Sequence, residues 1–101
     1  MQAQILPTRT SLNNISLRAQ AVVIGFRPGA KDLLVVVKKS KALKTIYVAP
    51  SYFATVSKSA IGLLAELGVA VKVTPTNQDT GKSFVWGHRT DVNGFIEIKE
   101  D

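Results

Sequence analysis

The sequence contains no cysteine, one histidine and no long apolar segment. Without cysteine, neither a disulfide framework nor a thiolate metal site can form, which excludes zinc fingers. The longest apolar runs, residues 21–26 and 33–37, are far shorter than the roughly 18 residues that cross a bilayer. The first residues also lack the basic start and apolar stretch of a secretory signal. We therefore expect a soluble protein without a membrane partner, located in the cytoplasm or packaged in a particle assembled inside a cell.

Acidic residues are scarce in the first part of the chain. In total, 13 Lys and Arg stand against 7 Asp and Glu, which gives a formal net charge of +6. Residues 1–60 carry nine of these cations and a single acid, Asp32, so their net charge is +8, whereas residues 61–101 have a net charge of −2. Such segregation indicates a face that meets an anion, because charge that served solubility alone could be scattered. The alternative is a small basic protein whose fold mixes the charges again.

The length of 101 residues fits one domain, and no repeat, low-complexity tract or linker interrupts it. Residues 1–14 contain Pro7 and several polar residues without periodicity, which predicts an extended N-terminal arm. Residues 15–101 are expected to form a single α+β domain.

Three strands are predicted before the first helix. Residues 17–26 alternate at first and then become continuously apolar, which is typical of a strand buried on both faces. The turn-forming residues 27–30 would reverse the chain into a second, antiparallel strand at residues 32–39. Residues 45–49 form the third predicted strand.

One helix is predicted at about residues 52–67. Pro50 ends the preceding strand, and Ser51 is a suitable N-cap. Apolar residues then recur at helical spacing: Phe53, Val56, Ala60, Leu63 and Leu67. Gly68 is the expected residue after the helix, in a left-handed conformation.

Three further strands are expected at residues 69–73, 83–87 and 94–99. The resulting order, β-β-β-α-β-β with an extra C-terminal strand, is the element order of an oligonucleotide-binding (OB) barrel, whose helix sits between the third and fourth strands. We therefore expect an α+β fold with mostly antiparallel strands, either an OB-like barrel or a curved sheet covered by one helix.

A run of lysines follows the second predicted strand, and two more cations lie at its other end. Phosphates attract such side chains by charge and counterion release, which requires only that they share a face. In an OB barrel the second and third strands form the ligand face, so a tyrosine on the third strand would offer its ring to a base, a contact worth ~1 to 3 kcal/mol. The predicted nucleic-acid-binding residues are Arg27, Lys31, Lys38, Lys39, Lys41, Lys44, Tyr47 and Lys82. A solvated turn is the alternative for the lysines, and a core position is the alternative for Tyr47 and for Phe26, Phe84 and Trp86.

Three patterns resemble catalytic or metal sites. Residues 79–83, Asp-Thr-Gly-Lys-Ser, are similar to a phosphate-binding loop but lack its first glycine and its following helix. Glu97 and Lys99 have the spacing of metal-dependent nucleases, which an exposed edge strand with alternating charge also explains. To act as a general base, His88, near Asp91, would need an orienting partner and a nucleophile within hydrogen-bond reach. The alternative is that both residues are ordinary polar residues of a loop. We therefore assign no catalytic residue, metal ligand or cofactor.

Three functions remain open. The first is a small basic, non-catalytic protein that binds DNA or RNA, as a single strand or through the backbone, with little sequence readout. The second is a structural or assembly subunit of a virion or filament, in which apolar strands form subunit contacts. The third is a nuclease or basic toxin that uses Glu97 and Lys99 or His88. Because one helix cannot cover two apolar strands, a homo-oligomer is also expected.

Overall fold

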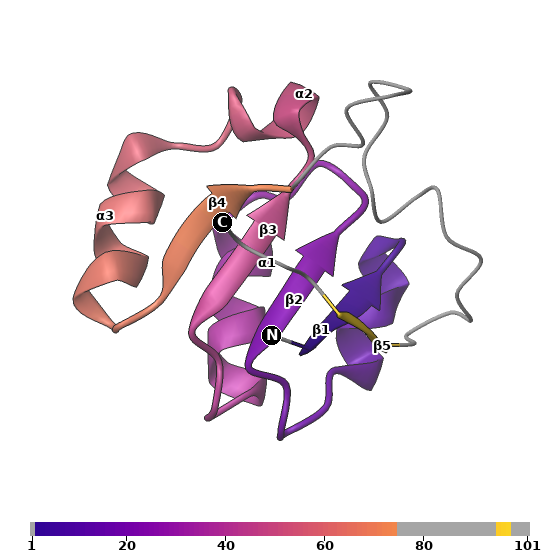
Figure 1. Cartoon of the computed structure of the whole chain (residues 1–101). Coiled ribbons are helices and arrows are strands. Elements are labelled where there is room, and N and C mark those ends of the chain that lie inside the picture. The colour runs from indigo at the N-terminus through magenta and orange to yellow at the C-terminus, as the bar shows by residue number, and fades with distance from the viewer. Residues whose placement is uncertain (1, 75–94, 98–101) are drawn as a thin grey trace.

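The computed structural model describes residues 2–74 and 95–97. They form a five-stranded sheet in the order β4-β3-β2-β1-β5, with helices packed against it (Figure 1). The strands are β1 (Gln2–Leu6), β2 (Ala21–Ile24), β3 (Thr45–Val48), β4 (Ala70–Val73) and β5 (Phe95–Glu97). The helices are the 3-10 helix η1 (Arg9–Asn14), α1 (Ala30–Lys39), α2 (Pro50–Phe53) and α3 (Lys58–Glu66).

The first four strands are all parallel, and β5 is antiparallel to β1. The prediction of mostly antiparallel strands, in an OB-like barrel or in a curved sheet with one helix, is therefore wrong. Neighbouring parallel strands cannot be joined by a tight turn, because the chain must cross back over the sheet between them. Here η1, α1 and the pair α2 and α3 provide these crossovers.

The largest local difference is at residues 32–39, which were expected to be a strand and belong to helix α1. The helix starts where the Asp32 Oδ2 accepts a hydrogen bond of 2.8 Å from the Gly29 backbone N–H. Leu33 and Val36, three residues apart, are buried, while the apolar residues between them stay partly exposed. An apolar run of this length fits either element, and packing on the sheet outweighs the strand preference of its valines.

The helix predicted at residues 52–67 is divided into α2 and α3. Ser57 caps α3, because its Oγ accepts a hydrogen bond of 3.4 Å from the Ala60 N–H. Ser51, the predicted cap, instead lies inside α2. Gly68 follows α3 with a φ of 83°, which confirms the predicted left-handed residue.

Residues 2–14 do not form the predicted arm, because they contain the sheet strand β1 and the helix η1. Strand β1 lies between β2 and β5, and η1 follows it. The buried Gln4 links the two elements, since its Nε2 donates to the Asn14 carbonyl and its Oε1 accepts from the Ser16 N–H, both at 2.8 Å. Backbone groups at the end of η1 and just after it thus satisfy the buried amide of Gln4.

The other predicted strands agree with the structure where it describes them. Residues 45–49 contain β3, residues 69–73 contain β4, and β5 falls within residues 94–99. The strand predicted at residues 83–87 lies outside the described residues. Within residues 2–74 and 95–97, no helix has the length and apolar character needed to cross a membrane.

The strands β1, β2 and β3 are buried on both faces of the sheet, whereas the edge strand β4 is largely exposed. Strand residues of one face pack with residues of η1, α1 and α3 in the main core, which includes Leu6, Leu12, Val22, Ile24, Leu33, Val36, Ile46, Val48 and Leu64. Strand residues of the other face form a second buried cluster, Ala3, Ile5, Ala21, Val23 and Tyr47. All four residues of β2 are fully buried, which confirms that this strand is covered on both sides.

Candidate polyanion-binding face

The carboxyl ends of the parallel strands bring several loops to one edge of the sheet. Arg9 follows β1, Phe26 and Arg27 follow β2, and Tyr52 follows β3. We call these four residues the carboxyl-edge cluster. Ligands of open α/β sheets bind outside this edge, so the cluster is a natural place to look for a site.

Two arginine–aromatic pairs form the carboxyl-edge cluster. The Arg9 guanidinium lies 5.4 Å from the centre of the Phe26 ring, and the Arg27 guanidinium lies 5.7 Å from the centre of the Tyr52 ring. Both distances are within the range of a cation–π contact. Arg9 Nη2 also donates to the Arg27 carbonyl at 3.1 Å, which joins the two pairs.

The two arginines differ in how their charge is compensated. Arg9 forms an ion pair with Asp32, with a distance of 3.2 Å between Nε and Oδ2. Arg27 is exposed and, among the described residues, makes no ion pair. Arg27 is therefore the cation of this cluster that is better able to meet an external anion.

Helix α1 extends the positive surface away from this edge. Lys31 and Lys38 are both exposed and are seven residues apart, which places them on the same side of the helix. Lys41 is exposed just after the end of the helix. Lys39 lies on another side, since its Nζ donates to the Leu12 carbonyl of η1 at 2.9 Å.

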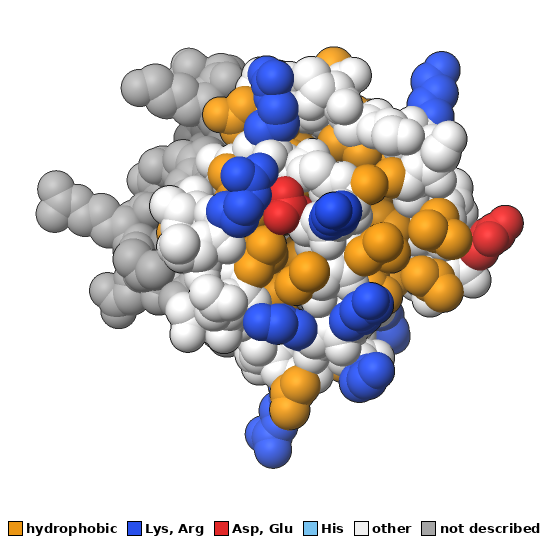
Figure 2. All heavy atoms as spheres, turned by 180° about the vertical axis from the view of Figure 1, so that it is seen from behind, with side chains coloured by type: hydrophobic (Ala, Val, Ile, Leu, Met, Phe, Trp, Pro, Cys, Tyr) orange, Lys and Arg blue, Asp and Glu red, His pale blue; other side chains and the backbone are white. Residues whose placement is uncertain are grey.

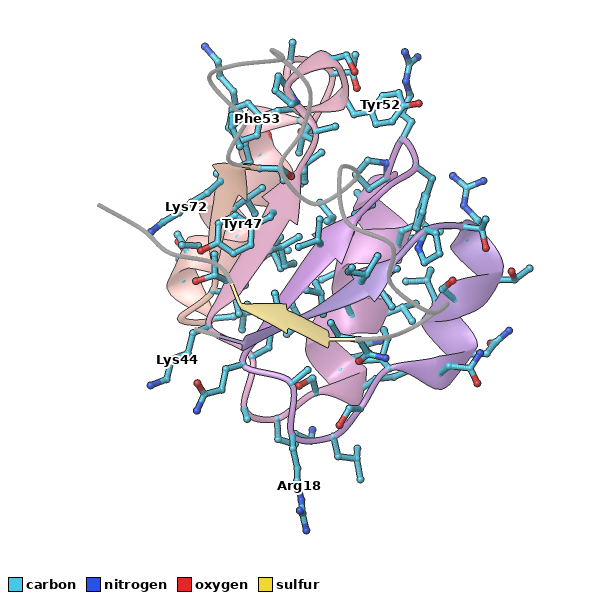
Figure 3. All side chains as sticks on the ribbon, turned by 45° about the vertical axis from the view of Figure 1, so that its right-hand side comes forward. Arg18, Lys44, Tyr47, Tyr52, Phe53 and Lys72 are labelled. Atoms are coloured by element: carbon cyan, nitrogen blue, oxygen red, sulfur yellow. The ribbon has the colours of Figure 1, made fainter. Side chains whose placement is uncertain are left out.

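Two predicted binding residues lie elsewhere. Lys44 is exposed at the amino end of β3, so Figure 3 shows it at the end of the sheet opposite Tyr52. Tyr47 is only 1% exposed and belongs to the buried cluster on the sheet face opposite α1. The core position, which was the open alternative for Tyr47, is the one that the structure shows. Lys82 lies outside the described residues.

We define the helix face as the outer surface of α1 and α3 with the adjoining loops. Some of the predicted binding residues lie on this face and others do not. The predicted residues that it brings together are Arg27, Lys31, Lys38 and Lys41. Arg9 and Tyr52 were not predicted from the sequence, and only the parallel order of the strands would have placed them beside Arg27.

Acidic side chains are scarce in residues 2–74, and both of them belong to the two helices of the helix face. Residues 2–74 carry ten Lys and Arg but only two acids, Asp32 and Glu66. Figure 2 shows this side of the molecule, where Lys and Arg side chains lie on several sides of an apolar area and an acidic side chain borders it on the right. The charge distribution fits an anionic partner.

The side chains of the three catalytic or metal-site patterns are not among those that the structure describes. In the part of the chain that it does describe, no three His, Cys, Asp or Glu side chains are close enough to hold a metal ion. His88, Asp91, Lys99 and residues 79–83 lie outside this part, as does the side chain of Glu97.

Comparison with known proteins places the chain in a family without assigning it a function. No curated protein and no solved structure matches it at a significant level. A family model described as "Family of unknown function (DUF1699) N-terminal domain" matches residues 2–94. Because this match covers nearly the whole sequence, the chain belongs to the DUF1699 family.

Proposed function

We propose that this protein binds nucleic acid through the phosphate backbone, with little sequence readout and without catalysis. The observation that carries the proposal is the pairing of Arg27 with Tyr52 at the carboxyl edge, beside the first turn of α1, where Lys31 lies. Cations on neighbouring elements can contact successive phosphates, and each contact releases counterions.

The chemistry of the carboxyl-edge cluster favours single strands. An exposed guanidinium binds phosphate in a bidentate manner, and a partly exposed aromatic ring offers a surface for an unpaired base. Arg27 and Tyr52 provide one group of each kind within 5.7 Å. Single-stranded nucleic acid is present in the cytoplasm and in particles assembled inside a cell. We therefore propose one of these two locations for the protein.

The test is a titration of fluorescein-labelled single-stranded DNA, duplex DNA and RNA with the full chain at increasing salt. We expect binding at ~50 mM salt, with the logarithm of the affinity falling linearly with the logarithm of the salt concentration. Inorganic polyphosphate serves as a control without bases, and it should bind more weakly than single-stranded DNA of equal charge. If none of the three nucleic acids binds at ~50 mM salt, the proposal is wrong.

The assembly-subunit hypothesis is not favoured by a specific observation. It required the apolar runs at residues 21–26 and 33–37 to be strands that contact another subunit, yet the residues of β2 are buried within this chain and residues 33–37 belong to helix α1. Homo-oligomerisation stays a separate prediction, and sedimentation at micromolar concentration and physiological salt tests it. A single species of 10.9 kDa would contradict it.

A further inference from the structure

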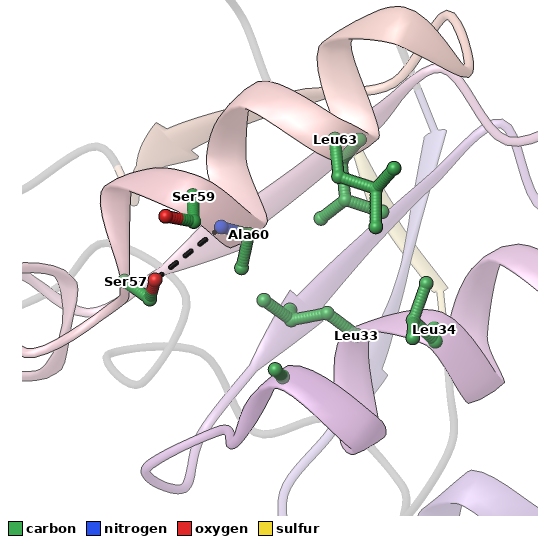
Figure 4. Close-up of a pocket in the computed structure, with 8 residues that line it drawn as sticks. Leu33, Leu34, Ser57, Ser59, Ala60 and Leu63 are labelled. Atoms are coloured by element: carbon green, nitrogen blue, oxygen red, sulfur yellow. Dashed lines mark hydrogen bonds between the residues drawn. The ribbon is translucent and has the colours of Figure 1, made fainter.

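An apolar groove lies between helices α1 and α3. It has a volume of about 240 Å³. Its walls come from both helices and include Leu33, Leu34, Ala60, Leu63 and Leu64. Figure 4 shows the side chains of Leu33 and Leu34 on α1 and of Ala60 and Leu63 on α3 around the space between the two helices. We call this feature the α1/α3 groove.

The apolar surface continues along α3. Leu63 is 46% exposed, and Leu67, one turn further, is 55% exposed. Residues four apart lie on the same side of a helix, so these two leucines form a ridge along the α1/α3 groove. A contiguous exposed apolar surface of this kind marks an interaction site more often than isolated apolar residues do.

Two lysines flank the groove on the α1 side. Leu34 lines the groove, and it lies three residues after Lys31 and four before Lys38. At these spacings all three side chains are neighbours on the helix surface. Lys31 and Lys38 are exposed, and the only acid in α3 is Glu66. Glu66 is exposed three residues after Leu63, beside the leucine ridge, so the positive charge borders the groove on the α1 side only. The occupant of the groove must therefore present apolar side chains together with negative charge on the side that faces α1.

This combination decides among the candidate occupants. Nucleic acid has the charge but no aliphatic side chains to fill a groove lined by leucines. A second copy of this chain has the leucines, but it would bring Lys31 and Lys38 of both copies together, and like charges at an interface are unfavourable. An amphipathic helix with acidic residues beside its apolar stripe has both properties.

We propose that the α1/α3 groove binds an acidic amphipathic helix of a partner protein. Apolar side chains of that helix at positions i and i+4 contact the leucines of the groove, and its Asp or Glu side chains lie near Lys31 and Lys38. This inference goes beyond the proposed nucleic-acid binding and does not rest on it, because the leucines of the groove have no part in contacting phosphate.

The first experiment measures binding of a designed, fluorescein-labelled peptide to the full chain by fluorescence anisotropy. The peptide is a helix with leucines at i, i+4 and i+8 and glutamates at the flanking positions. One control has the same composition in an order that does not place the leucines on one side, and another has lysine in place of glutamate. We expect the designed peptide to bind at least about tenfold more tightly than either control.

The second experiment uses variants of the groove. Leu63→Ser should weaken peptide binding at least about fivefold while leaving binding of single-stranded DNA unchanged, so that failure of this proposal and failure of the proposed function can be told apart. Lys58→Gln is the control on the same helix, because Lys58 lies five residues before Leu63 and on another side of α3. If circular dichroism shows that Leu63→Ser is unfolded, the more exposed Leu67→Ser replaces it.

Three results would overturn the proposal. One is equal binding of the designed peptide and the control with the same composition, which would indicate charge attraction alone. Another is unchanged peptide binding in folded Leu63→Ser and Leu67→Ser. The third is a wild-type dimer in sedimentation that Leu63→Ser dissociates, which would assign the groove to a second copy of this chain.

Discussion

Arg9 Nε lies 3.2 Å from Asp32 Oδ2, so an ion pair joins the start of η1 to the first turn of α1. The same carboxylate oxygen accepts a hydrogen bond from the Gly29 N–H. Asp32 is the only acid in residues 1–60. Because it is engaged in these two contacts, it leaves Arg27 and Lys31 available for an external anion.

Asp32→Ala is expected to lower the free energy of unfolding by about 1 to 2 kcal/mol, because it removes both the helix cap and the ion pair. Urea denaturation measures this change. Arg9→Ala is the matched variant, and it should cost less than about 1 kcal/mol, since the Arg9 side chain is 64% exposed. A larger loss for Arg9→Ala than for Asp32→Ala would show that the cap contributes little.

Val36→Ala and Val35→Ala test the helical state of residues 30–39. Val36 is fully buried, so we expect a loss of about 2 kcal/mol on truncation. Val35 is half-buried, and its truncation should cost less than about 1 kcal/mol, partly because alanine favours a helix. Thermal unfolding of both variants provides the comparison. If the segment were a strand, Leu33 and Val35 would share the buried side, and the order of the two effects would be reversed.

Gly68→Ala and Gly62→Ala should change stability in opposite directions. Gly68 has a φ of 83°, so an alanine there is strained and should destabilise the protein by about 1 to 2 kcal/mol. Gly62 lies inside α3, and a Cβ added there meets no atom within 4 Å. Gly62→Ala should therefore stabilise the protein by about 0.5 to 1 kcal/mol. Denaturant midpoints measured in parallel would contradict this prediction if both changes had the same sign.

The double variant Lys31→Gln/Lys38→Gln tests which cations contact phosphate. It should weaken binding to all single-stranded sequences by a similar factor and reduce the salt slope by about 0.7 for each phosphate that the variant no longer neutralises. The control is Arg18→Gln/Lys44→Gln, because Figure 3 shows these two residues at the end of the sheet opposite Tyr52. We expect a smaller change in slope for the control, measured by anisotropy with labelled oligonucleotides. Equal slopes for the two double variants would mean that the helix face is not the contact surface.

The sequence predicted the elements that have one clear local signal. The apolar run at residues 21–24 has no polar alternation, and it is a strand buried on both faces. Gly68 has the expected left-handed conformation, because a helix ended there and glycine adopts positive φ without strain. The strands at β3 and β4 were also predicted, from their alternating and apolar patterns.

A local pattern leads to a wrong prediction where the same residues are compatible with two different secondary structures. Residues 27–29 contain proline and glycine, which serve a tight turn as well as the start of a helix. A tight turn at these residues makes residues 32–39 an antiparallel strand. In the structure Gly29 precedes α1, and the chain crosses the sheet to a parallel β3.

The candidate site could be predicted only in part. Arg27, Lys31 and Lys38 were identified from charge alone; all three are exposed, and Lys31 and Lys38 share one side of α1. The position of Tyr47 was not decided by its neighbours in the sequence, because a strand residue lies on one of two faces and packing determines whether that face is buried.

The sequence by itself determined the excess of positive charge, the absence of thiol chemistry and several buried strands, because composition and short apolar runs depend only on nearby residues. Only the tertiary structure decided that the strands are parallel, that Arg27 lies against Tyr52 and that α1 and α3 enclose an apolar groove. Each of these depends on residues from different elements, whose meeting is set by the crossovers and the packing of the whole chain.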